Sequence, residues 1–491
     1  MAVLAIDAGT TGVTCLVIDD ALRTRGRAYA EFTQHYPRPG WVEHDAEEIL
    51  ATSLHVARAA AKDADVPLRS LAALGITNQR ETAVLWDRAS GQPVHRAIVW
   101  QDRRTAAACH AMTADWEDTV RRRTGLLLDP YFSASKLQWM LDNVPGLRDR
   151  ARQGGLAFGT VDAWLLWRLT GGRVHATDVT NASRTLLWDI HAGAWDAELL
   201  EAFGIPEAVL PDVRPSAHDH GPTDASVFGA EVPVAGLVGD QQGALFGQRC
   251  FEAGQAKNTY GTGCFLLQHT GGEAVASRNG LVTTRAASTD GGARFALEGS
   301  IFVAGAAVQW VRDGLGLIKA APEIDGLASQ VEDSEGVVLV PAFTGLGAPY
   351  WDPHARGALL GITRGTDRRH IARATLDAIA FQSADLVTAM QEDSGTRIEE
   401  LRVDGGATRS APLMQIQADV LQRPVVRPAE VDTTAYGSAM LAGLATGVWG
   451  MGDFREPGGE KVFRPRIKAE AAEARMRTWH HAVEAVRAYR P

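Results

Sequence analysis

Residues 3–19 read VLAIDAGTTGVTCLVID, two apolar runs separated by a short turn of glycine and threonine. This pattern predicts a strand over Val3–Asp7, a turn at Gly9–Gly12 and a second strand over Val13–Asp19, which together form a β-hairpin. A third strand around Ala28–Gln34 would extend the hairpin into a three-stranded meander.

The same layout recurs near the middle of the chain. Strands are expected over Ala256–Tyr260 and Cys264–His269, with the turn Gly261–Gly263 between them. A chance repeat in a chain with 50 glycines is the alternative. The repeat favours two related domains, residues 1–249 and residues 250–491, as does a length of 491 residues, about three times that of a typical domain.

The rest of the chain alternates between expected strands and helices, so the fold class is α/β. Asp45, with Glu48 three residues later, predicts a helix that begins with a capping box. The other expected elements are strands over Leu71–Thr77, Val234–Val238 and Leu401–Val403, a helix after Asp367, a helix through Leu413–Leu421 and a final helix over Ala469–Tyr489.

The composition argues against several classes of protein. A net charge of −10, from 49 basic and 59 acidic residues, argues against a nucleic-acid partner, which needs a clustered basic face. No apolar run approaches the roughly 18 residues of a membrane span, and the N-terminus lacks the pattern of a signal peptide. The four cysteines have no metal-type spacing and favour reduced thiols. We therefore expect a cytoplasmic protein with no nucleic-acid partner and no membrane insertion.

The common patterns GxxxxGK[ST], GxGxxG, HExxH and GxSxG are absent, so any phosphate chemistry needs another cradle. The turn Gly9–Gly12 can serve, because its glycines let backbone N–H groups converge on phosphate oxygens while Thr10 and Thr11 add hydroxyl donors. Asp7 beside it can hold a water molecule of hydrated Mg²⁺. An ordinary hairpin turn is the alternative. The paired turn Gly261–Gly263 favours two loops that hold a polyphosphate across a cleft.

Three polar segments at expected strand ends carry candidate substrate chemistry. Asp240, in the run Gly239–Gly243, can accept a hydroxyl proton, or can instead cap the following helix. The pair Arg80–Glu81 offers donors and acceptors to a polyol, or forms a solvated ion pair. Asp404–Ala407, which reads DGGA, lets a flat ligand approach the backbone, or forms a tight turn.

Taken together, these segments resemble the FGGY family of carbohydrate kinases. The similarity covers essentially the whole chain, and its long runs make chance agreement implausible. The matching segments are Asp7–Gly12, Asn78–Thr82, Trp100–Thr105, Asp129–Ser133, Gly159–Trp188, Gly239–Gln242, Lys257–Cys264, Phe343–Arg364 and Asp404–Ala407.

The resemblance implies two ribonuclease-H-like domains of the actin and hexokinase type, with ATP in the cleft between them. It implies ATP-dependent phosphorylation of glycerol to sn-glycerol 3-phosphate, the entry step of glycerol catabolism, with Mg²⁺ as cofactor and Asp240 as general base. The residues implied to hold glycerol are Arg80, Glu81, Trp100, Tyr131, Asp240, Gln241 and Phe265. Those implied to contact ATP are Thr10, Thr11, Gly12, Thr262, Gly305, Gln309 and Gly406, with Asp7 holding the metal through water.

The chain departs from the family pattern at Ala8, Thr14 and Ser410, where a Gln, an Arg and an Asn are common. These departures bear on ATP binding and leave the implied glycerol residues unchanged. Two rival functions stay open, namely a sister kinase acting on a pentulose or another polyol, and a non-catalytic ATP-binding module of the actin or chaperone type. We also expect a homo-oligomer, a dimer or a tetramer, with glycerol and ATP or ADP as ligands.

Overall fold

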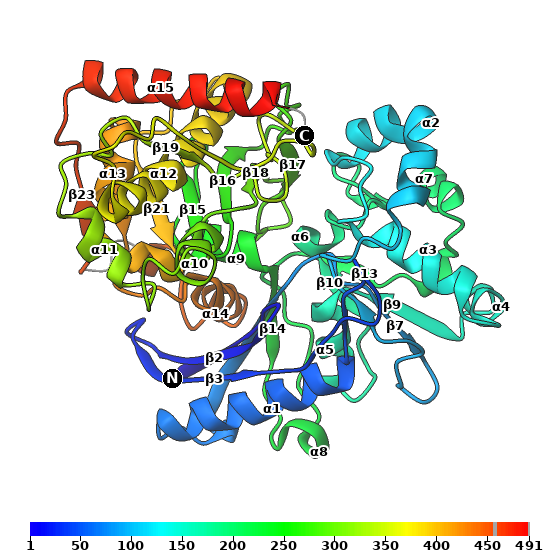
Figure 1. Cartoon of the computed structure of the whole chain (residues 1–491). Helices are drawn as coiled ribbons and strands as arrows, with labels where there is room; N and C mark the ends of the chain where they lie inside the picture. Colours follow the sequence, from blue (N-terminus) through cyan, green and yellow to red (C-terminus); the bar gives the residue numbers. More distant parts are fainter. Residues whose placement is uncertain (455–458, 490–491) are drawn as a thin grey trace.

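Two mixed β-sheets, each covered by helices, form the centre of the molecule in a computed structural model that describes residues 1–454 and 459–489 (Figure 1). Within these residues the first sheet has the strand order β14-β6-β1-β2-β3 and the second has the order β17-β18-β16-β15-β21-β22-β23. The strands of the first sheet are β1 Ala2–Ala8, β2 Gly12–Asp19, β3 Thr24–Glu31, β6 Leu71–Asn78 and β14 Val234–Gly239. Those of the second are β15 Ala256–Tyr260, β16 Cys264–Gly271, β17 Val282–Arg285, β18 Phe295–Ile301, β21 Leu401–Asp404, β22 Val425–Arg427 and β23 Lys461–Phe463.

The two sheets share one topology. Strand β1 is antiparallel to β2 and parallel to β6, which is parallel to β14. In the second sheet β15 is antiparallel to β16 and parallel to β21, which is parallel to β22. The expected repeat of a hairpin followed by α/β units is therefore confirmed, together with the α/β fold class.

Helices lie on both sheets and in a lobe that α2, α3, α4 and α7 form on the side of the molecule away from the second sheet (Figure 1). The helices are α1 Ala46–Asp63, α2 Ala106–Thr124, α3 Ser133–Asn143, α4 Leu147–Arg152, α5 Val161–Leu169, α6 Val179–Ala182, α7 Ala197–Ala202, α8 Ala225–Phe228, α9 Asp240–Gly247, α10 Gly305–Asp313, α11 Glu323–Ala328, α12 Arg368–Ser394, α13 Ala411–Leu421, α14 Thr433–Ala445 and α15 Ala469–Ala488. The short strands outside the two sheets are β4 Gln34–His35, β5 Glu43–His44, β7 Val84–Asp87, β8 Ala97–Ile98, β9 Leu156–Gly159, β10 Ala176–Asp178, β11 Trp188–Asp189, β12 Ala194–Trp195, β13 Asp212–Arg214, β19 Val338–Val340 and β20 Ala358–Leu360.

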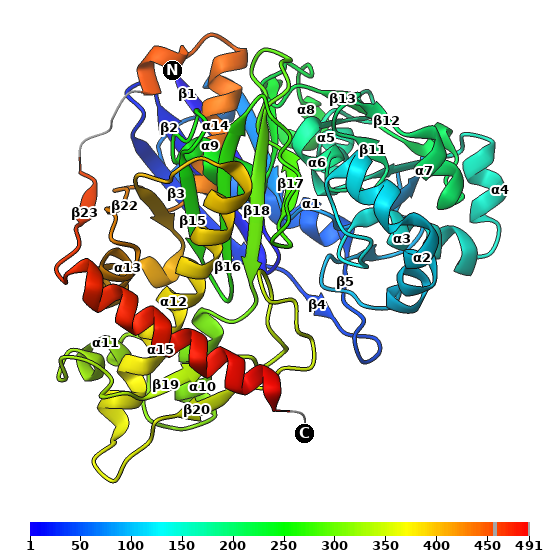
Figure 2. The same ribbon diagram turned by 90° about the horizontal axis from the view of Figure 1, so that it is seen from above.

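Helix α14 connects the two halves of the chain, because it comes late in the sequence but packs on β6 and β14 of the first sheet. Gly75 in β6 permits this approach, since a Cβ atom there would lie 2.2 Å from the carbonyl oxygen of Ser438. The last helix, α15, crosses the outer side of α12, as Figure 2 shows, with Trp479 and Val483 buried. The division of the chain at residue 250 stays a prediction.

The expected three-stranded meander near the N-terminus is confirmed, but the bounds of its third strand and the expected capping box are wrong. The third strand runs over Thr24–Glu31 rather than Ala28–Gln34, because a tight turn in which Leu22 N donates to the Asp19 carbonyl (2.9 Å) reverses the chain at once. Asp45 does cap α1, accepting from the backbone N–H of Glu47 and Glu48. The Glu48 carboxylate, however, accepts from Thr33 instead of returning to the cap, so no capping box forms.

All four cysteines are buried, and none of them is paired in a disulfide. In residues 1–454 and 459–489, no helix combines the length and the apolar character that crossing a membrane requires.

Candidate active site

Four buried charged side chains meet between the two sheets and form what we call the charge ring: Arg80, Glu81, Arg184 and Glu298. Glu298 accepts from Arg80 Nη1 at Oε2 (2.6 Å) and from Arg184 Nη2 at Oε1 (3.1 Å). Arg184 Nε donates to Glu81 Oε1 (2.6 Å), and Arg80 Nε lies 3.8 Å from that same oxygen. Each member is at most 2% exposed, so the alternative of a solvated Arg80–Glu81 pair is wrong.

The charge ring is formally neutral, but the pKa values of its two carboxylates shift in opposite directions. Burial tends to raise the pKa of Glu298, yet the Arg184 and Arg80 guanidinium groups outweigh it and lower this pKa to about 2. For Glu81 burial prevails over the same two arginines, and its pKa lies above the ordinary value. Glu81 also has a φ of +62°, a left-handed conformation that is costly for a residue with a side chain. Ser133 Oγ fixes this backbone by donating to the Glu81 carbonyl (3.0 Å).

Asp240 lies at the edge of the charge ring and is the first residue of α9, directly after β14. Its Oδ1 atom is 3.1 Å from Arg80 Nε, and its side chain is 28% exposed. Burial raises the pKa of Asp240, and the Arg80 cation partly opposes this effect. Gly239, not Asp240, occupies the N-cap position, so the capping alternative is wrong. A partly exposed carboxylate beside a buried cation can accept a proton from a bound hydroxyl group.

The next two side chains of α9 tie this helix to both sheets. Gln241 Oε1 accepts from Nζ of the buried Lys257 in β15 (2.5 Å). Burial lowers the pKa of Lys257 to about 8. Gln242 Oε1 accepts from Arg80 Nη1 (3.1 Å), while Gln242 Nε2 donates to Thr284 Oγ1 in β17 (3.1 Å). The start of α9 is thus held by residues from both halves of the chain.

Trp100 and Tyr131, both expected in the substrate site, together form one aromatic wall. The rings of Trp100 and Tyr131 meet edge to face, with centroids 5.4 Å apart. Trp100 Nε1 donates to Thr10 Oγ1 (3.0 Å), which joins this wall to the first glycine-threonine turn. Phe265 lies on β16 and reaches the site through its carbonyl oxygen, which accepts from Lys257 Nζ (3.3 Å).

Lys136 holds the segment that carries Tyr131. Its side chain is fully buried in α3, and Nζ donates to the carbonyl oxygens of Pro130 (2.6 Å), Tyr131 (2.7 Å) and Phe132 (2.8 Å). Burial lowers the pKa of Lys136 to about 8, which neighbouring carboxylates partly counteract. Three carbonyl groups on one ammonium fix the backbone at Tyr131.

The turn Gly9–Gly12 joins β1 to β2 and lies against the site. Thr11 is exposed, and its carbonyl oxygen accepts from Phe32 N (3.3 Å). Gly12 cannot carry a side chain without a shift of its neighbours, because a Cβ atom would lie 2.5 Å from the carbonyl oxygen of Ala30.

Asp7, at the end of β1, lies near two other carboxylates. Its pKa is raised to about 8 by burial and by the carboxylates of Asp240 and Asp432. Within the described residues no group of three or more His, Cys, Asp or Glu side chains is arranged to ligate a metal ion directly. A hydrated Mg²⁺ carried by phosphate oxygens fits this donor set, because Mg²⁺ keeps several water ligands that carboxylates can accept from.

The second turn and the start of α10 form one unit. Gly305 N donates to the Gly261 carbonyl (3.0 Å) and Ala306 N donates to the Thr262 carbonyl (3.0 Å). A Cβ atom at Gly305 would lie 2.6 Å from the Gly261 oxygen, so this contact needs glycine. Gln309 is exposed one helical turn further along α10.

The DGGA turn lies against the end of β15. Gly405 has a φ of +88°, and a Cβ atom there would lie 2.5 Å from the Tyr260 carbonyl oxygen. Gly406 is exposed beyond it, at the start of a short 3₁₀ helix over Gly406–Arg409. Asp404 accepts from Thr433 Oγ1 (2.7 Å), the first residue of α14. The exposed parts of the turn Gly261–Gly263 and of the DGGA turn therefore lie at the same end of β15.

The three positions that depart from the family pattern have structural roles here. Ala8 is buried in β1, and Thr14 lies opposite Asp7 in the β1–β2 ladder. Ser410 caps α13 by accepting from Leu413 N (3.2 Å), and its hydroxyl donates to Asp325 Oδ1 (2.6 Å).

The structure thus brings Arg80, Glu81, Asp240 and Gln241 into one connected cluster, and Thr262, Gly305 and Gly406 to the end of β15. Sequence reasoning missed the residues that hold this cluster: Arg184, Glu298, Lys257, Gln242 and Lys136. A usable signal was present for two of them, because Glu298 and Lys257 are lone charges in strands that are otherwise uncharged.

Family models, curated relatives and a solved structure resemble this chain over nearly its whole length. Residues 2–247 match the family model "FGGY family of carbohydrate kinases, N-terminal domain", and residues 256–446 match the C-terminal domain of the same family. The chain is 55% identical over 490 residues to a glycerol kinase of Deinococcus radiodurans, covering 99% of this chain and 97% of that protein. It is 56% identical over 487 residues to a glycerol kinase of Rhodopirellula baltica, covering 98% and 90%. The crystal structure of Plasmodium falciparum glycerol kinase with ADP superposes with a TM-score of 0.92 at 34% identity, over 99% of this chain and 98% of that one.

Proposed function

The chain belongs to the FGGY family of carbohydrate kinases, and from that premise we propose that it transfers the γ-phosphoryl group of ATP to glycerol. The observation that carries the proposal is the partly exposed Asp240 carboxylate beside the buried charge ring, in a chain 55% identical to a curated glycerol kinase. The product is sn-glycerol 3-phosphate, and the reaction is the entry step of glycerol catabolism.

Glycerol binds, in this proposal, where the charge ring meets the aromatic wall. Arg80 donates to the hydroxyl groups and Glu81 accepts from them, while Trp100 and Tyr131 cover the carbon chain, with Phe265 opposite. Gln241 adds an amide group that Lys257 already orients. Hydroxyl groups that bond to charged partners in a dry site contribute about 1.5–3 kcal/mol each, which is enough to select a small polyol.

Asp240 acts as the general base. Its carboxylate accepts the proton of a terminal hydroxyl group as the oxygen forms a bond to the γ-phosphorus atom. The bond from that phosphorus to the bridging oxygen breaks, and its electron pair leaves with ADP. Because the chemistry needs little beyond alignment and charge stabilisation, the fixed position of Asp240 next to Arg80 supports this role.

The nucleotide occupies the two glycine turns and the end of β15. Thr10, Thr11, Gly12 and Thr262 bind the phosphates, and the nucleoside end lies over Gly305, Gln309 and Gly406. Asp7 would hold Mg²⁺ through its water ligands; when bound, this ion neutralises charge on the phosphates. The raised pKa of Asp7 supports the assignment, because a nearby cation would favour its ionised form.

The proposal assigns residues 1–249 to glycerol and the first phosphate turn, and residues 250–491 to the nucleotide. We propose a cytoplasmic homo-oligomer, a dimer or a tetramer. Exposed aromatic side chains support self-association, since Phe302 and Trp351 are 46% and 44% exposed and their ring centroids lie 6.5 Å apart. Light scattering on the purified chain tests the oligomeric state.

Release of ADP, measured with glycerol, xylulose and gluconate in parallel, tests the function. We expect turnover with glycerol, and Asp240→Asn is expected to lower kcat by about 10²–10⁴-fold because the general base is lost. Asp115→Asn, an exposed site on α2, is the matched control. Retention of more than about a tenth of wild-type kcat by Asp240→Asn would remove the base assignment. A preference for xylulose or gluconate would favour the sister-kinase alternative, and an ATPase that ignores glycerol would favour the non-catalytic module.

A further inference from the structure

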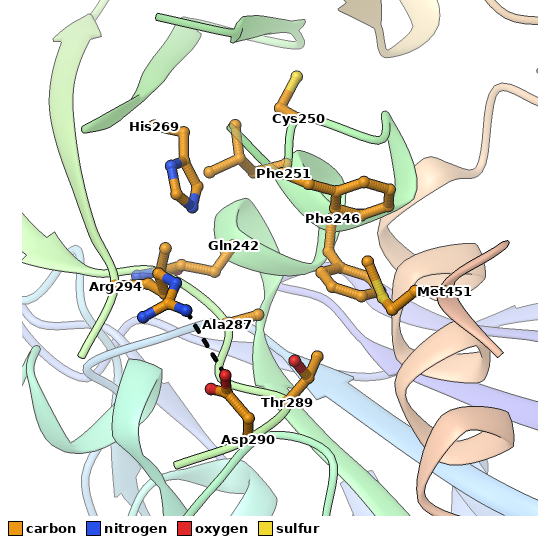
Figure 3. Close-up of a pocket in the computed structure, with 12 residues that line it drawn as sticks. Gln242, Phe246, Cys250, Phe251, His269, Ala287, Thr289, Asp290, Arg294 and Met451 are labelled. Atoms are coloured by element: carbon orange, nitrogen blue, oxygen red, sulfur yellow. Dashed lines mark hydrogen bonds and ion pairs between the residues drawn. The ribbon is translucent and has the colours of Figure 1, made fainter. Parts of the chain in front are cut away.

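A cavity of about 180 Å³ lies beside α9, between this helix, β16 and the segment that joins β17 to β18 (Figure 3). None of its lining residues belongs to the set expected to bind glycerol or ATP. Figure 3 shows His269 and Arg294 on one side of the cavity and Phe246, Phe251 and Met451 on the other. The cavity therefore has a cationic, hydrogen-bonding wall and an apolar wall.

His269 supplies a hydrogen-bond donor that the fold leaves unused. The side chain is 4% exposed, and Nδ1 accepts from Gly271 N (3.0 Å). Burial lowers the pKa of His269 to about 4, so the imidazole is neutral near pH 7 and its proton lies on Nε2. In the described part of the chain, Nε2 makes no hydrogen bond to another residue. Because His269 lines the cavity, its Nε2–H group can donate to a ligand that brings an acceptor there.

Arg294 supplies a positive charge that is only weakly paired. Its Nη2 atom lies 3.5 Å from Asp290 Oδ2, and the two side chains are 42% and 62% exposed. Exposed ion pairs of this length contribute little, so an anionic ligand can displace Asp290. The guanidinium group also donates to the Ala293 carbonyl (3.1 Å), which leaves other N–H groups for a ligand.

We propose that this cavity binds a small carboxylic acid with an apolar body, its carboxylate on His269 and Arg294 and its body against Phe246 and Phe251. The size fits, because an apolar protein cavity of roughly 150 Å³ accommodates benzene. A carboxylate suits the two donors better than a neutral group, since charge-assisted hydrogen bonds are the stronger ones. A bulky polyphosphate does not fit the volume or the apolar wall.

Gln242 couples this cavity to the glycerol site that we propose above, and this part of the inference rests on the proposed function. Gln242 lines the cavity and also accepts from Arg80 Nη1. Its Nε2 atom donates to the Arg285 carbonyl (3.2 Å), at the start of the segment that leads into β18 and Glu298. A ligand that packs against this segment stabilises the arrangement that presents Arg80 to glycerol. We therefore expect the ligand to lower the KM for glycerol and to leave kcat unchanged.

Calorimetric titration of the full chain with benzoate, in the absence of glycerol and nucleotide, tests the site. Benzamide, which has the same shape without the charge, is the matched ligand control. Benzoate is expected to bind about tenfold or more tightly than benzamide, and Arg294→Ala to remove that preference. Arg278→Ala, an exposed arginine outside the lining, is expected to bind benzoate like the wild type. Ala287→Phe, which fills the cavity, is expected to abolish binding of both ligands.

No heat of binding for benzoate, or equal affinity in Arg294→Ala and wild type, overturns the site. The titration needs no turnover, so its result stands even if the chain fails to phosphorylate glycerol. Where benzoate binds, the KM for glycerol is measured with and without it. An unchanged KM overturns the coupling through Gln242.

Discussion

Glu298→Gln is the perturbation that tests the charge ring most directly, because it removes one negative charge and changes the side-chain shape little. Glu298 accepts two hydrogen bonds from Arg80 and one from Arg184, and all three side chains are buried. The variant leaves both arginines with too few anionic partners. An uncompensated buried charge is among the most destabilising changes that a single substitution can make.

The size of the effect follows from the pKa of Glu298. Its depression from 4.5 to about 2 in the folded state corresponds to roughly 3 kcal/mol in favour of the ionised form. Because the folded pKa is the lower one, this stabilisation is fully present above about pH 4.5 and is lost as the pH falls toward 2. We therefore expect Glu298→Gln to lower the free energy of unfolding by about 3 kcal/mol at pH 7. The difference from the wild type should shrink on acidification below about pH 4.5.

Urea unfolding followed by tryptophan fluorescence at a series of pH values measures the stability, and steady-state kinetics measure the consequence for the site. The KM for glycerol is expected to rise about tenfold, because Arg80 loses its fixed position, while the KM for ATP changes little. Glu231→Gln, at an exposed glutamate with no side-chain hydrogen bond or ion pair among the described residues, is the control. Glu298→Asp, which keeps the charge, should recover part of the glycerol affinity.

Two outcomes would refute this reasoning. The first is a Glu298→Gln stability within about 0.5 kcal/mol of the Glu231→Gln control at pH 7. The second is a stability difference that does not narrow as the pH falls, which would mean that the ionised Glu298 carboxylate is not what stabilises the fold.

Two further predictions concern residues outside the charge ring. Lys136→Met should raise the KM for glycerol about tenfold and leave the KM for ATP unchanged, because the backbone around Tyr131 loses its common donor. Measured against Lys62→Met, an exposed control, an equal rise in both KM values would assign Lys136 to the fold alone. His480 donates to Asp385 (2.8 Å), and this bond raises the pKa of His480 above 6.5. The stability that His480 contributes to the docking of α15 is therefore fully present below pH 6.5 and is lost as the pH rises through the raised pKa. His480→Gln should flatten this pH dependence of the thermal midpoint, and an unchanged pH profile would remove the role.

Much of the fold was predictable from local patterns. The apolar runs on either side of the turns at residues 9–12 and 261–263 predicted both hairpins, because an apolar run and the turn that ends it lie within a few positions of one another. The buried face of α15 was predictable in the same way from Trp479, Val483 and Val486. The absence of a capping box at Glu48 was not predictable in this way, since Thr33, fifteen residues away, competes for the Glu48 carboxylate.

For the candidate site, the sequence by itself determined which residue types stand at the strand ends: Asp7, Arg80, Glu81, Asp240 and the two glycine turns. It could not determine that Arg80 and Glu81 are buried, or that their principal partners are Glu298 and Arg184. Arg80 and Glu298 are 218 positions apart, and only the tertiary arrangement that places β18 beside the segment after β6 brings their charges within hydrogen-bond distance. Contacts of such separation depend on how whole sheets pack, because neither local propensity nor spacing carries that information. The tertiary structure therefore decided which charges are buried and which are paired. Of the three carboxylates that pair with Arg80 in the described part of the chain, it left only that of Asp240 partly exposed.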